Sequence, residues 1–348
     1  MQPLEHLLIS PELLKTIGEI DEFKGRWEAL ARLTPERLSA LRHVATIESI
    51  GSSTRIEGTR LSDDEVQRLL SGVRIRSFRS RDEQEVAGYA ELMELIFASW
   101  REIPLAEDHI KQLHGVLLRH SEKDDRHRGR YKTLPNHVEA FDDGGKSLGV
   151  IFKTASPFDT PHLMTDLVDW TRGALERHEH HPLLIIAVFV VRFLAIHPFQ
   201  DGNGRLSRAL TTLLMLRTGY EYVPFSSFER IIEDNKDEYY LRLRHAQATL
   251  NHGEAQLAEW IQFFVRCLVQ QKDVLLRKIE RERLVAPLPP LSEKLLEIVR
   301  ERGRVTVRDG VALTGANRNT VKSHLRQLVL AGRLARRGQR RGAWYEKA

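Results

Sequence analysis

One short stretch of the chain holds residue types that together suit chemistry on a phosphate ester. Residues 197–208 read His-Pro-Phe-Gln-Asp-Gly-Asn-Gly-Arg-Leu-Ser-Arg. The stretch combines a base, a carboxylate, two glycines around an asparagine, and two arginines three residues apart. This set fits a polyphosphate, a divalent cation and a nucleophile that must lose its proton. We therefore expect an enzyme that transfers part of a nucleotide.

The glycines of this stretch predict an anion-binding turn. Gly202 and Gly204 allow backbone conformations that a side chain would forbid, so amide N–H groups can converge on a phosphate. A helix is expected to begin near Gly204, and its N-terminus would add partial positive charge at the same place. Arg205 and Arg208 would share one face of that helix and could contact successive phosphates.

Two further side chains of the stretch suit the remaining tasks. Asp201 offers the hard oxygen ligand that Mg²⁺ prefers when it bridges phosphate oxygens. His197 has an ordinary pKa of about 6.5 and can accept a hydroxyl proton near neutral pH. A bare Gly-Asn-Gly would be interpreted as a surface turn, but the full twelve-residue string argues against that interpretation.

The rest of the chain predicts a mainly α fold. Ser62-Asp63-Asp64-Glu65 has the pattern of a capping box at a helix start. The stretch 129–161 differs, because Asp-Asp-Gly-Gly followed by Gly-Val-Ile-Phe-Lys-Thr indicates a β-hairpin. Further helices are expected near 84–100, 107–119, 160–175, 183–196, 204–217, 235–250 and 254–280.

The longest apolar run, Leu183–Ile196, predicts a buried helix. Its fourteen residues are interrupted by Arg192. At about 1.5 Å per residue the run covers about 21 Å, which is short of the roughly 30 Å hydrocarbon core of a bilayer. We therefore expect a core helix and no membrane span.

The stretch 197–208 resembles the motif of the Fic family, His-x-Phe-x-(Asp/Glu)-Gly-Asn-Gly-Arg-x-x-Arg, at every specified position. The resemblance extends over about residues 50–270 and implies a helical core with a small hairpin flap. It also implies transfer of AMP from ATP to a Ser, Thr or Tyr hydroxyl of a protein, with Mg²⁺ as cofactor and pyrophosphate as product. Family variants that transfer UMP or phosphocholine, or act as kinases, leave the donor open, although Arg208 argues against the kinase-type variant.

Carried over residue by residue, the resemblance implies a role for each motif position. His197 would be the general base on the target hydroxyl, Phe199 would anchor the loop in the core, and Asp201 would hold Mg²⁺. Arg208 would contact the γ-phosphate. The ATP-binding set would be Gly202, Asn203, Gly204, Arg205, Leu206 and Arg208.

Two flanking segments are expected to complete the site. The hairpin residues Ile151, Phe152, Lys153 and Thr154 resemble the flap that docks the target segment by strand addition. Lys153-Thr154-Ala155 stand where the family commonly has prolines. Asn235, Tyr239 and Tyr240 are candidates for the adenine pocket, with ordinary amphipathic packing as the alternative.

Ser53-Thr54-Arg55-Ile56-Glu57-Gly58 resembles the inhibitory motif of the family, (Ser/Thr)-x-x-x-Glu-(Gly/Asn). By itself the pattern also fits a helix end with a glycine cap. The resemblance implies a helix over about residues 50–58 that carries Ser53 and Glu57. Glu57 would pair with Arg208, withhold it from the γ-phosphate and keep basal activity low. In some relatives the same glutamate helps remove AMP from targets.

The last segment of the chain carries a localised positive charge. From Leu291 to Ala348 there are 14 Lys and Arg against 5 Asp and Glu, a net charge of +9. The whole chain has only +5, so the first 290 residues carry −4. Ser292 is expected to cap the first helix of a winged helix-turn-helix. Its candidates for DNA contact are Asn317, Arg318, Lys322, Arg326, Arg336 and Arg337. A protein-interaction or dimer-forming winged helix with solvated charges is the alternative.

These patterns predict an organisation and a set of partners. We expect an N-terminal helical region over 1–100, a catalytic core over 101–280, a Pro-rich linker over 281–290 and the winged helix over 291–348. One cysteine, Cys267, and no signal-peptide pattern favour the cytoplasm. The expected partners are a protein substrate, which could be the chain itself, DNA, and a second copy in a homodimer. A DNA-binding regulator whose core only senses nucleotide is the competing hypothesis.

Overall fold

The computed structural model describes residues 4, 7, 9–30, 35–71, 78, 80–141, 147–250, 257–285, 289–338 and 343–348. The chain forms two compact units, Met1–Glu280 and Arg281–Ala348. Helices dominate the described residues, which confirms the predicted mainly α fold class. None of the described helices is long and apolar enough to cross a membrane.

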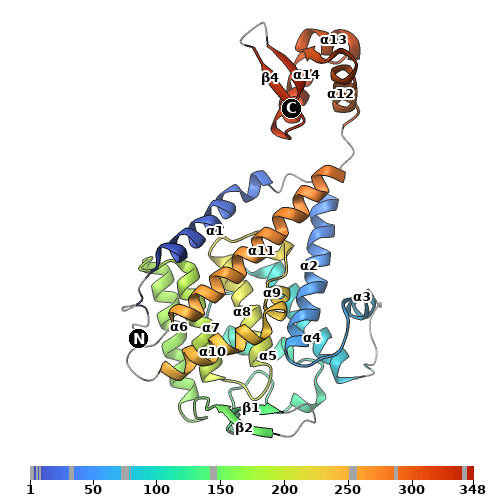
Figure 1. The fold of residues 1–348 in the computed structure, drawn as a ribbon. Coiled ribbons are helices and arrows are strands. Elements are labelled where there is room, and N and C mark those ends of the chain that lie inside the picture. The colour runs from blue at the N-terminus through green and yellow to red at the C-terminus, as the bar shows by residue number, and fades with distance from the viewer. Residues whose placement is uncertain are drawn as a thin grey trace. The chain divides into compact units, whose positions relative to one another are not determined.

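The first unit is a helical assembly with one small hairpin (Figure 1). Its helices are α1 Pro11–Leu30, α2 Pro35–Ile56, α3 Asp63–Ser71, α4 Arg81–Ser99, α5 Glu107–Leu117, η1 Glu122–Asp124, α6 Thr160–Arg177, α7 Pro182–Ile196, α8 Asn203–Arg217, η2 Val223–Phe225, α9 Phe228–Asp234, α10 Lys236–Thr249 and α11 Ala258–Val285. The capping box at Ser62–Glu65 is present, because Glu65 accepts from the Ser62 N–H while the Glu65 N–H donates to Ser62 Oγ.

The core of this unit is built around α7 and α8. α7 is apolar on all sides except at Arg192, so it can be stable only when other elements cover its whole circumference. It contacts α6, α8 and α10, and α11 packs on it as well, with the Trp260 indole donating to the Ala187 carbonyl at 2.7 Å. The six-residue loop 197–202 joins α7 to α8 and is therefore held at both ends by buried helices.

The predicted hairpin forms within the stretch 129–161. Strands β1 Val138–Phe141 and β2 Ser147–Phe152 pair antiparallel, and Val138 lies opposite Phe152. The strands form a separate sheet of their own, so β2 has an edge that β1 does not cover. A strand edge with unpaired backbone groups can accept an added strand.

The second unit packs helices against a small antiparallel sheet. Its elements are α12 Pro290–Arg302, β3 Arg304–Thr306, α13 Val307–Thr314, α14 Arg318–Leu330, β4 Leu334–Arg337 and β5 Trp344–Lys347, with strand order β3-β5-β4. Leu295, Val305 and Leu325 are fully buried in its own apolar core. Gly315 adopts a positive φ of 72° and ends α13.

The expected capping role of Ser292 is wrong. α12 begins at Pro290, whose ring suits the first helical turn because it needs no N–H partner there. Ser292 is buried inside the helix, and its hydroxyl lies 2.8 Å from His324 Nδ1 of α14. It therefore joins two helices of the unit and caps neither.

Candidate active site

His197 lies at the point where α7 ends. Its backbone adopts the left-handed conformation, with φ of 53°, and its N–H donates to the Phe193 carbonyl at 2.8 Å. The ring atom Nδ1 lies 3.3 Å from the Leu194 carbonyl, a contact that requires a proton on Nδ1. Nε2 is then the unprotonated nitrogen, available to accept a proton. Burial lowers the pKa of His197 to about 4, so the ring is neutral at pH 7.

The loop after His197 is closed by the side-chain amide of Asn203. Asn203 Oδ1 accepts from the Phe199 N–H at 2.9 Å, and Asn203 Nδ2 donates to the Phe199 carbonyl at 2.7 Å. The Phe199 ring is fully buried and stacks on His114, with ring centroids 3.9 Å apart. Asn203 therefore fixes the loop through its side chain, so that only its backbone N–H remains for an anion.

The two glycines of the loop are required for different reasons. Gly202 has a φ of 80°, in the left-handed region that side chains rarely adopt. Gly204 leaves room for a neighbour, since a Cβ there would lie 2.0 Å from Glu57 Oε1. The first turn of α8 thus exposes its backbone N–H groups beside His197, as an anion-binding helix N-terminus requires.

A cavity of about 470 Å³ opens over this turn, within the size range of small-molecule sites. Tyr239 and Tyr240 of α10 form part of its wall, with their rings edge to face and the centroids 5.2 Å apart. Burial raises the pKa of Tyr239 to about 12, so its hydroxyl stays protonated. The residues that line the cavity are Glu57, Asn136, His137, Phe152, Leu194, His197, Gln200, Asp201, Gly202, Asn203, Gly204, Arg208, Tyr239, Tyr240, Leu243, Arg244 and Gln247.

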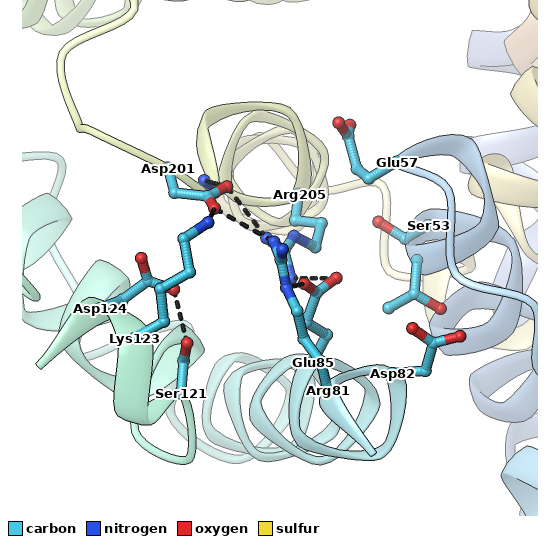
Figure 2. Close-up of polar contacts among 12 residues, drawn as sticks. Ser53, Glu57, Arg81, Asp82, Glu85, Ser121, Lys123, Asp124, Asp201 and Arg205 are labelled. Carbon is cyan, nitrogen blue, oxygen red and sulfur yellow. Dashed lines mark hydrogen bonds and ion pairs between the residues drawn. The ribbon is translucent and has the colours of Figure 1, made fainter. Parts of the chain in front are cut away.

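Asp201 is surrounded by cationic side chains (Figure 2). Its Oδ1 accepts from the Gly202 N–H at 2.6 Å and lies 3.3 Å from Arg205 Nη2. Its Oδ2 lies 3.4 Å from both Arg81 Nη2 and Lys123 Nζ. Burial would raise the pKa of Asp201, but Arg205 and the Gly202 N–H outweigh it and hold the pKa below its ordinary value. The carboxylate is therefore charged at neutral pH.

The Asp201 carboxylate suits a metal ion that takes most of its other oxygen ligands from a bound polyphosphate. In the part of the chain that the structure describes, no group of three or more His, Cys, Asp or Glu could bind a metal. Mg²⁺ in phosphate sites commonly uses one or two carboxylates and completes its shell with phosphate oxygens and water. Asp201 fits that role, with the polyphosphate as the second source of oxygens.

Arg208 is held by the end of α2. Its Nε donates to Ser53 Oγ at 2.8 Å, and its Nη2 donates to the Ser53 carbonyl at 2.8 Å and to Glu57 Oε1 at 2.8 Å. The arginine is 2% exposed, while the Glu57 side chain keeps 31% of its surface open beside the cavity. Burial acts to raise the pKa of Glu57, but Arg208 and Arg205 outweigh it and lower that pKa. The pair is thus a charged ion pair at the cavity wall.

A second arginine fixes the segment that carries Glu57. Arg55 Nε lies 2.6 Å from Glu233 Oε1 of α9, and Arg55 Nη1 lies 2.9 Å from Asp63 Oδ1 of α3. Gly58 follows with a φ of 106° and ends the helix there. The helix end with a glycine cap is confirmed, and the same segment places Glu57 against Arg208.

Sequence reasoning missed a buried cluster behind the loop. Lys132 is 3% exposed, and its Nζ donates to Ile196 O at 2.9 Å, Asn136 Oδ1 at 2.8 Å and Thr154 Oγ1 at 3.0 Å. Asn136 Nδ2 donates in turn to the carbonyls of His197 at 3.1 Å and Phe199 at 2.6 Å. Together with the Lys132 N–H, which donates to the Pro198 carbonyl at 2.8 Å, the cluster binds every carbonyl from Ile196 to Phe199. Burial lowers the pKa of Lys132 to about 8.

A buried acid beside Arg208 was also missed. Glu229 of α9 is 2% exposed, and its Oε1 accepts from the Tyr89 hydroxyl at 3.1 Å. Burial raises the pKa of Glu229 above its ordinary value. No motif surrounds Lys132 or Glu229, so the sequence around them carries no signal that would have singled them out.

Several expected ATP contacts do not reach the cavity. Arg205 is 2% exposed, pairs with Glu85 at 2.9 Å as well as with Asp201, and is not among the residues that line the cavity. Leu206 is fully buried in the core. Asn235 does not line the cavity either, because its Nδ2 donates to the Ile231 carbonyl at 2.8 Å. Each packs or pairs internally because α8 and α9 turn these positions toward neighbouring helices.

The residues expected to form the flap differ in how exposed their side chains are. Phe152 lines the cavity, Lys153 is exposed, and Thr154 is buried with its hydroxyl bound to Lys132 and Asn136. The side chain of Ile151 lies outside the described residues.

In the second unit, the candidates for DNA contact are spread over α14 and β4. Arg318, Lys322, Arg326, Arg336 and Arg337 are exposed. Asn317 instead caps α14, with its side chain accepting from the Asn319 N–H at 2.9 Å. Arg337 pairs with Glu346 at 2.8 Å. Lys322, Arg326 and Arg336 line one groove.

Comparison with known proteins agrees with this geometry. Residues 104–215 match the Fic/DOC family, and residues 287–347 match a bacterial protein family of unknown function, DUF977. The protein adenylyltransferase Fic of Drosophila willistoni is 27% identical over 246 residues, which cover 69% of this chain and 44% of that protein. The protein adenylyltransferase fic-1 of Caenorhabditis elegans is 26% identical over 219 residues, covering 59% and 39%. The chain thus spans less than half the length of these curated relatives.

A solved structure extends the similarity over nearly the whole chain. A Fic family protein from Desulfovibrio desulfuricans G20 has a TM-score of 0.64 and 24% identity, covering 98% of this chain and 97% of that one. At this identity the similarity shows the fold alone. The family match and the complete motif around His197 show that residues 104–215 form a Fic domain.

Proposed function

We propose that the chain is a self-inhibited protein adenylyltransferase that moves AMP from ATP to a Ser, Thr or Tyr hydroxyl of a protein. One observation carries the proposal. His197, with Nδ1 held by the Leu194 carbonyl, lies in the same cavity as the N-terminus of α8. A base poised beside an anion-binding turn is what transfer requires, and simple nucleotide sensing would not need the base. The adenylyltransferases named among the relatives support the same chemistry.

The reaction follows from the positions of these groups. The triphosphate would lie against the backbone N–H groups of Gly202, Asn203 and Gly204, with the adenine between the cavity wall and Tyr239 or Tyr240. Asp201 would hold Mg²⁺, which when bound neutralises phosphate charge. The target hydroxyl attacks the α-phosphorus, its proton passes to His197 Nε2, and the bond to the β-phosphate breaks to release pyrophosphate.

The target segment would dock on the free edge of β2. Strand addition uses main-chain hydrogen bonds, so it tolerates different side chains while holding one hydroxyl at a set depth. Phe152 of β2 lines the same cavity as His197, which supports docking of the target segment at this edge.

Glu57 would inhibit the basal transfer activity. Its carboxylate neutralises Arg208, the arginine expected at the γ-phosphate, and adds negative charge where the triphosphate would bind. ATP could then bind only with its α-phosphate turned away from in-line attack. The same carboxylate could orient a water toward a modified hydroxyl, which would make the enzyme remove AMP in the reverse direction.

Incubation with labelled ATP and Mg²⁺ tests the proposal. Transfer of label to the chain or to proteins in a cell lysate is expected, with none in His197→Ala. Labelled UTP and CTP should transfer far less. Release of AMP from pre-labelled protein, absent in Glu57→Gly, would show the reverse activity. Nucleotide binding without transfer in the wild type and in Glu57→Gly would instead favour the sensor hypothesis.

We further propose that the second unit binds DNA. The observation that favours this is the groove lined by Lys322, Arg326 and Arg336, in a segment of net charge +9. Phosphate contacts make affinity fall steeply with salt. Binding of the full chain to labelled duplex DNA should therefore weaken by at least about tenfold between 50 and 200 mM salt.

Charge-matched variants separate this groove from general basicity. Lys322→Ala with Arg326→Ala should weaken DNA binding, whereas Lys294→Ala with Arg300→Ala, two exposed positions on α12, should change it little. Equal effects of the two pairs, or a flat salt response, would favour a protein-interaction role.

A further inference from the structure

Arg192 is a charged residue in a helix that is otherwise apolar and buried. It is the single charged residue of α7. Among the residues that the structure describes it makes no hydrogen bond or ion pair, and its Nε is shielded from water without a partner. Burial lowers its pKa. A donor nitrogen that is shielded from water without a hydrogen bond costs free energy of folding.

Arg192 lines a second cavity, beside the one that holds His197. This cavity has a volume of about 340 Å³ and is bordered by Lys153 and Thr154 from the flap. It shares Phe152 and Gln247 with the His197 cavity, so the two are neighbours on either side of these side chains. Its lining carries two cations and one carboxylate.

That carboxylate does not neutralise Arg192. It belongs to Asp159, whose Oδ2 accepts from the Ser156 hydroxyl at 2.6 Å and whose N–H donates to Ser156 Oγ at 3.1 Å. Among the described residues the cavity lining therefore keeps a net positive charge, and Arg192 Nε lacks an acceptor. An external anion would satisfy both.

The Arg192 cavity lies next to the His197 cavity beside the end of β2. Phe152, the last residue of β2, lines both cavities, and Lys153 and Thr154, which follow it, line the Arg192 cavity alone. Side chains on one face of a strand are two residues apart, or about 6.8 Å. A peptide added to β2 with its hydroxyl at His197 would bring a side chain two residues away to the Arg192 cavity.

We propose that the Arg192 cavity is a specificity site for an Asp or Glu side chain of the target, two residues from the modified hydroxyl. The proposal rests on the adenylyltransferase function proposed above. The guanidinium can donate two parallel hydrogen bonds to a carboxylate, which gives geometric selectivity as well as charge attraction. Lys153 adds a second positive charge at the flap.

Modified sites in a cell lysate test the specificity. The Glu57→Gly variant is incubated with lysate, labelled ATP and Mg²⁺, and AMP-bearing peptides are identified by mass spectrometry. We expect Asp and Glu enriched at least about threefold two residues from the modified hydroxyl, a preference that a charge-assisted pair of under 1 kcal/mol would produce. Adding Arg192→Ala should remove the enrichment, and adding Arg192→Glu should replace it with Lys and Arg. Arg172→Ala, an exposed position on α6, is the control and should leave the preference unchanged.

The outcomes separate the two proposals. Transfer without acidic enrichment, or enrichment that survives Arg192→Ala, overturns the specificity site and leaves the adenylyltransferase function intact. No AMP-bearing peptide from any variant overturns the adenylyltransferase function, and the specificity site with it.

Thermal unfolding gives a readout that does not depend on activity. Arg192→Leu removes an unpartnered guanidinium from an apolar helix, so the midpoint should rise by about 2–4 °C. Arg205→Leu is the matched control on α8, where the guanidinium pairs with Glu85 and Asp201, and its midpoint should fall. A fall for Arg192→Leu as large as that for Arg205→Leu would show that Arg192 is a structural residue and would overturn the proposal.

Discussion

Glu57 Oε1 lies 2.8 Å from Arg208 Nη2, and Ser53, one helical turn before Glu57, accepts from Arg208 Nε at 2.8 Å. Two contacts from one helix therefore orient a single buried guanidinium. The nearness of Glu57 to Gly204, where no side chain larger than hydrogen fits without displacing the carboxylate, places the same oxygen against the phosphate-binding turn. One carboxylate thus pairs with the arginine and lies against the turn.

Removing the Glu57 carboxylate should activate the enzyme. In Glu57→Gly, Arg208 loses its ion pair and becomes available to the γ-phosphate, so ATP-dependent self-labelling should rise by at least about tenfold, which corresponds to about 1.4 kcal/mol. Labelling with radioactive or biotinylated ATP measures the change. Glu57→Gln keeps the shape of the side chain without its charge and should activate partially, whereas Glu57→Gly with His197→Ala should not label. Unchanged labelling in Glu57→Gly would exclude Glu57 as a brake.

The pH dependence of transfer should show an unusually acidic histidine. The pKa of His197 is lowered from 6.5 to about 4, so the base form persists well below neutral pH. Glu57 acts to raise that pKa, and its loss in Glu57→Gly should lower it further. Because kcat/KM reports the free enzyme, its acid limb in Glu57→Gly should lie below pH 5. An apparent pKa near 6.5 assigned to His197 would contradict the buried, Nδ1-protonated ring.

The Mg²⁺ requirement of ATP-dependent labelling should depend on the positively charged side chains around Asp201. EDTA should abolish labelling, and Asp201→Asn should reduce it by at least about a hundredfold, as removal of a charged ligand for a metal bound to phosphate commonly does. Arg81→Ala with Lys123→Ala removes two cations that lie 3.4 Å from Asp201 Oδ2. We expect this pair to lower the Mg²⁺ concentration needed for half-maximal labelling and to tighten Mn²⁺ binding in the presence of ATP.

A charge-matched control decides the meaning of that result. Arg119→Ala removes an exposed cation paired with Glu91 and should leave the Mg²⁺ requirement unchanged. A higher Mg²⁺ requirement in the Arg81 and Lys123 double variant would show that these side chains assist phosphate binding and do not compete with the metal.

Lys132 should act on catalysis through the loop. Lys132→Met removes the donor to Ile196, Asn136 and Thr154, which should cost about 2 kcal/mol of unfolding free energy and loosen the carbonyls on either side of His197. The lost hydrogen bonds position His197 and not the glycine turn expected to bind phosphate. The kcat should therefore fall by about tenfold, while the KM for ATP changes little. Steady-state kinetics in the Glu57→Gly background measure both parameters. Lys278→Met, at a lysine paired with Glu48, is the control, and an equal loss in the two variants would leave Lys132 without a positioning role.

The elements that local chemistry specifies were predictable. α7 is a continuous apolar run, and such a run must be buried on all sides, which predicted a core helix in front of the motif. Gly202 and Gly204 predicted a turn that only glycine permits, and the structure shows a positive φ at the first and a neighbouring carboxylate at the second. The hairpin and the capping box at Ser62–Glu65 were predictable because each depends on residues close together in the chain.

Contacts between distant segments were beyond such reasoning. Lys132 and Ile196 are separated by 64 positions, and nothing around Lys132 in the sequence indicates that its ammonium caps the end of α7. The ion pair of Arg205 with Glu85 was unpredictable for a related reason, because α4 supplies Glu85 at a distance of 2.9 Å. Packing between helices decides which of two arginines on one helix faces the cavity.

The sequence by itself determined the chemical groups of the stretch 197–208, because a base, a carboxylate and a glycine-bounded turn follow from residue types at short spacing. Only the tertiary structure decided how those groups are used. It brought Glu57 to Arg208 across 151 residues, turned Arg205 toward Glu85 and left Arg192 Nε without a partner among the described residues. Charge pairing depends on distance in space, which a chain acquires only when its helices pack.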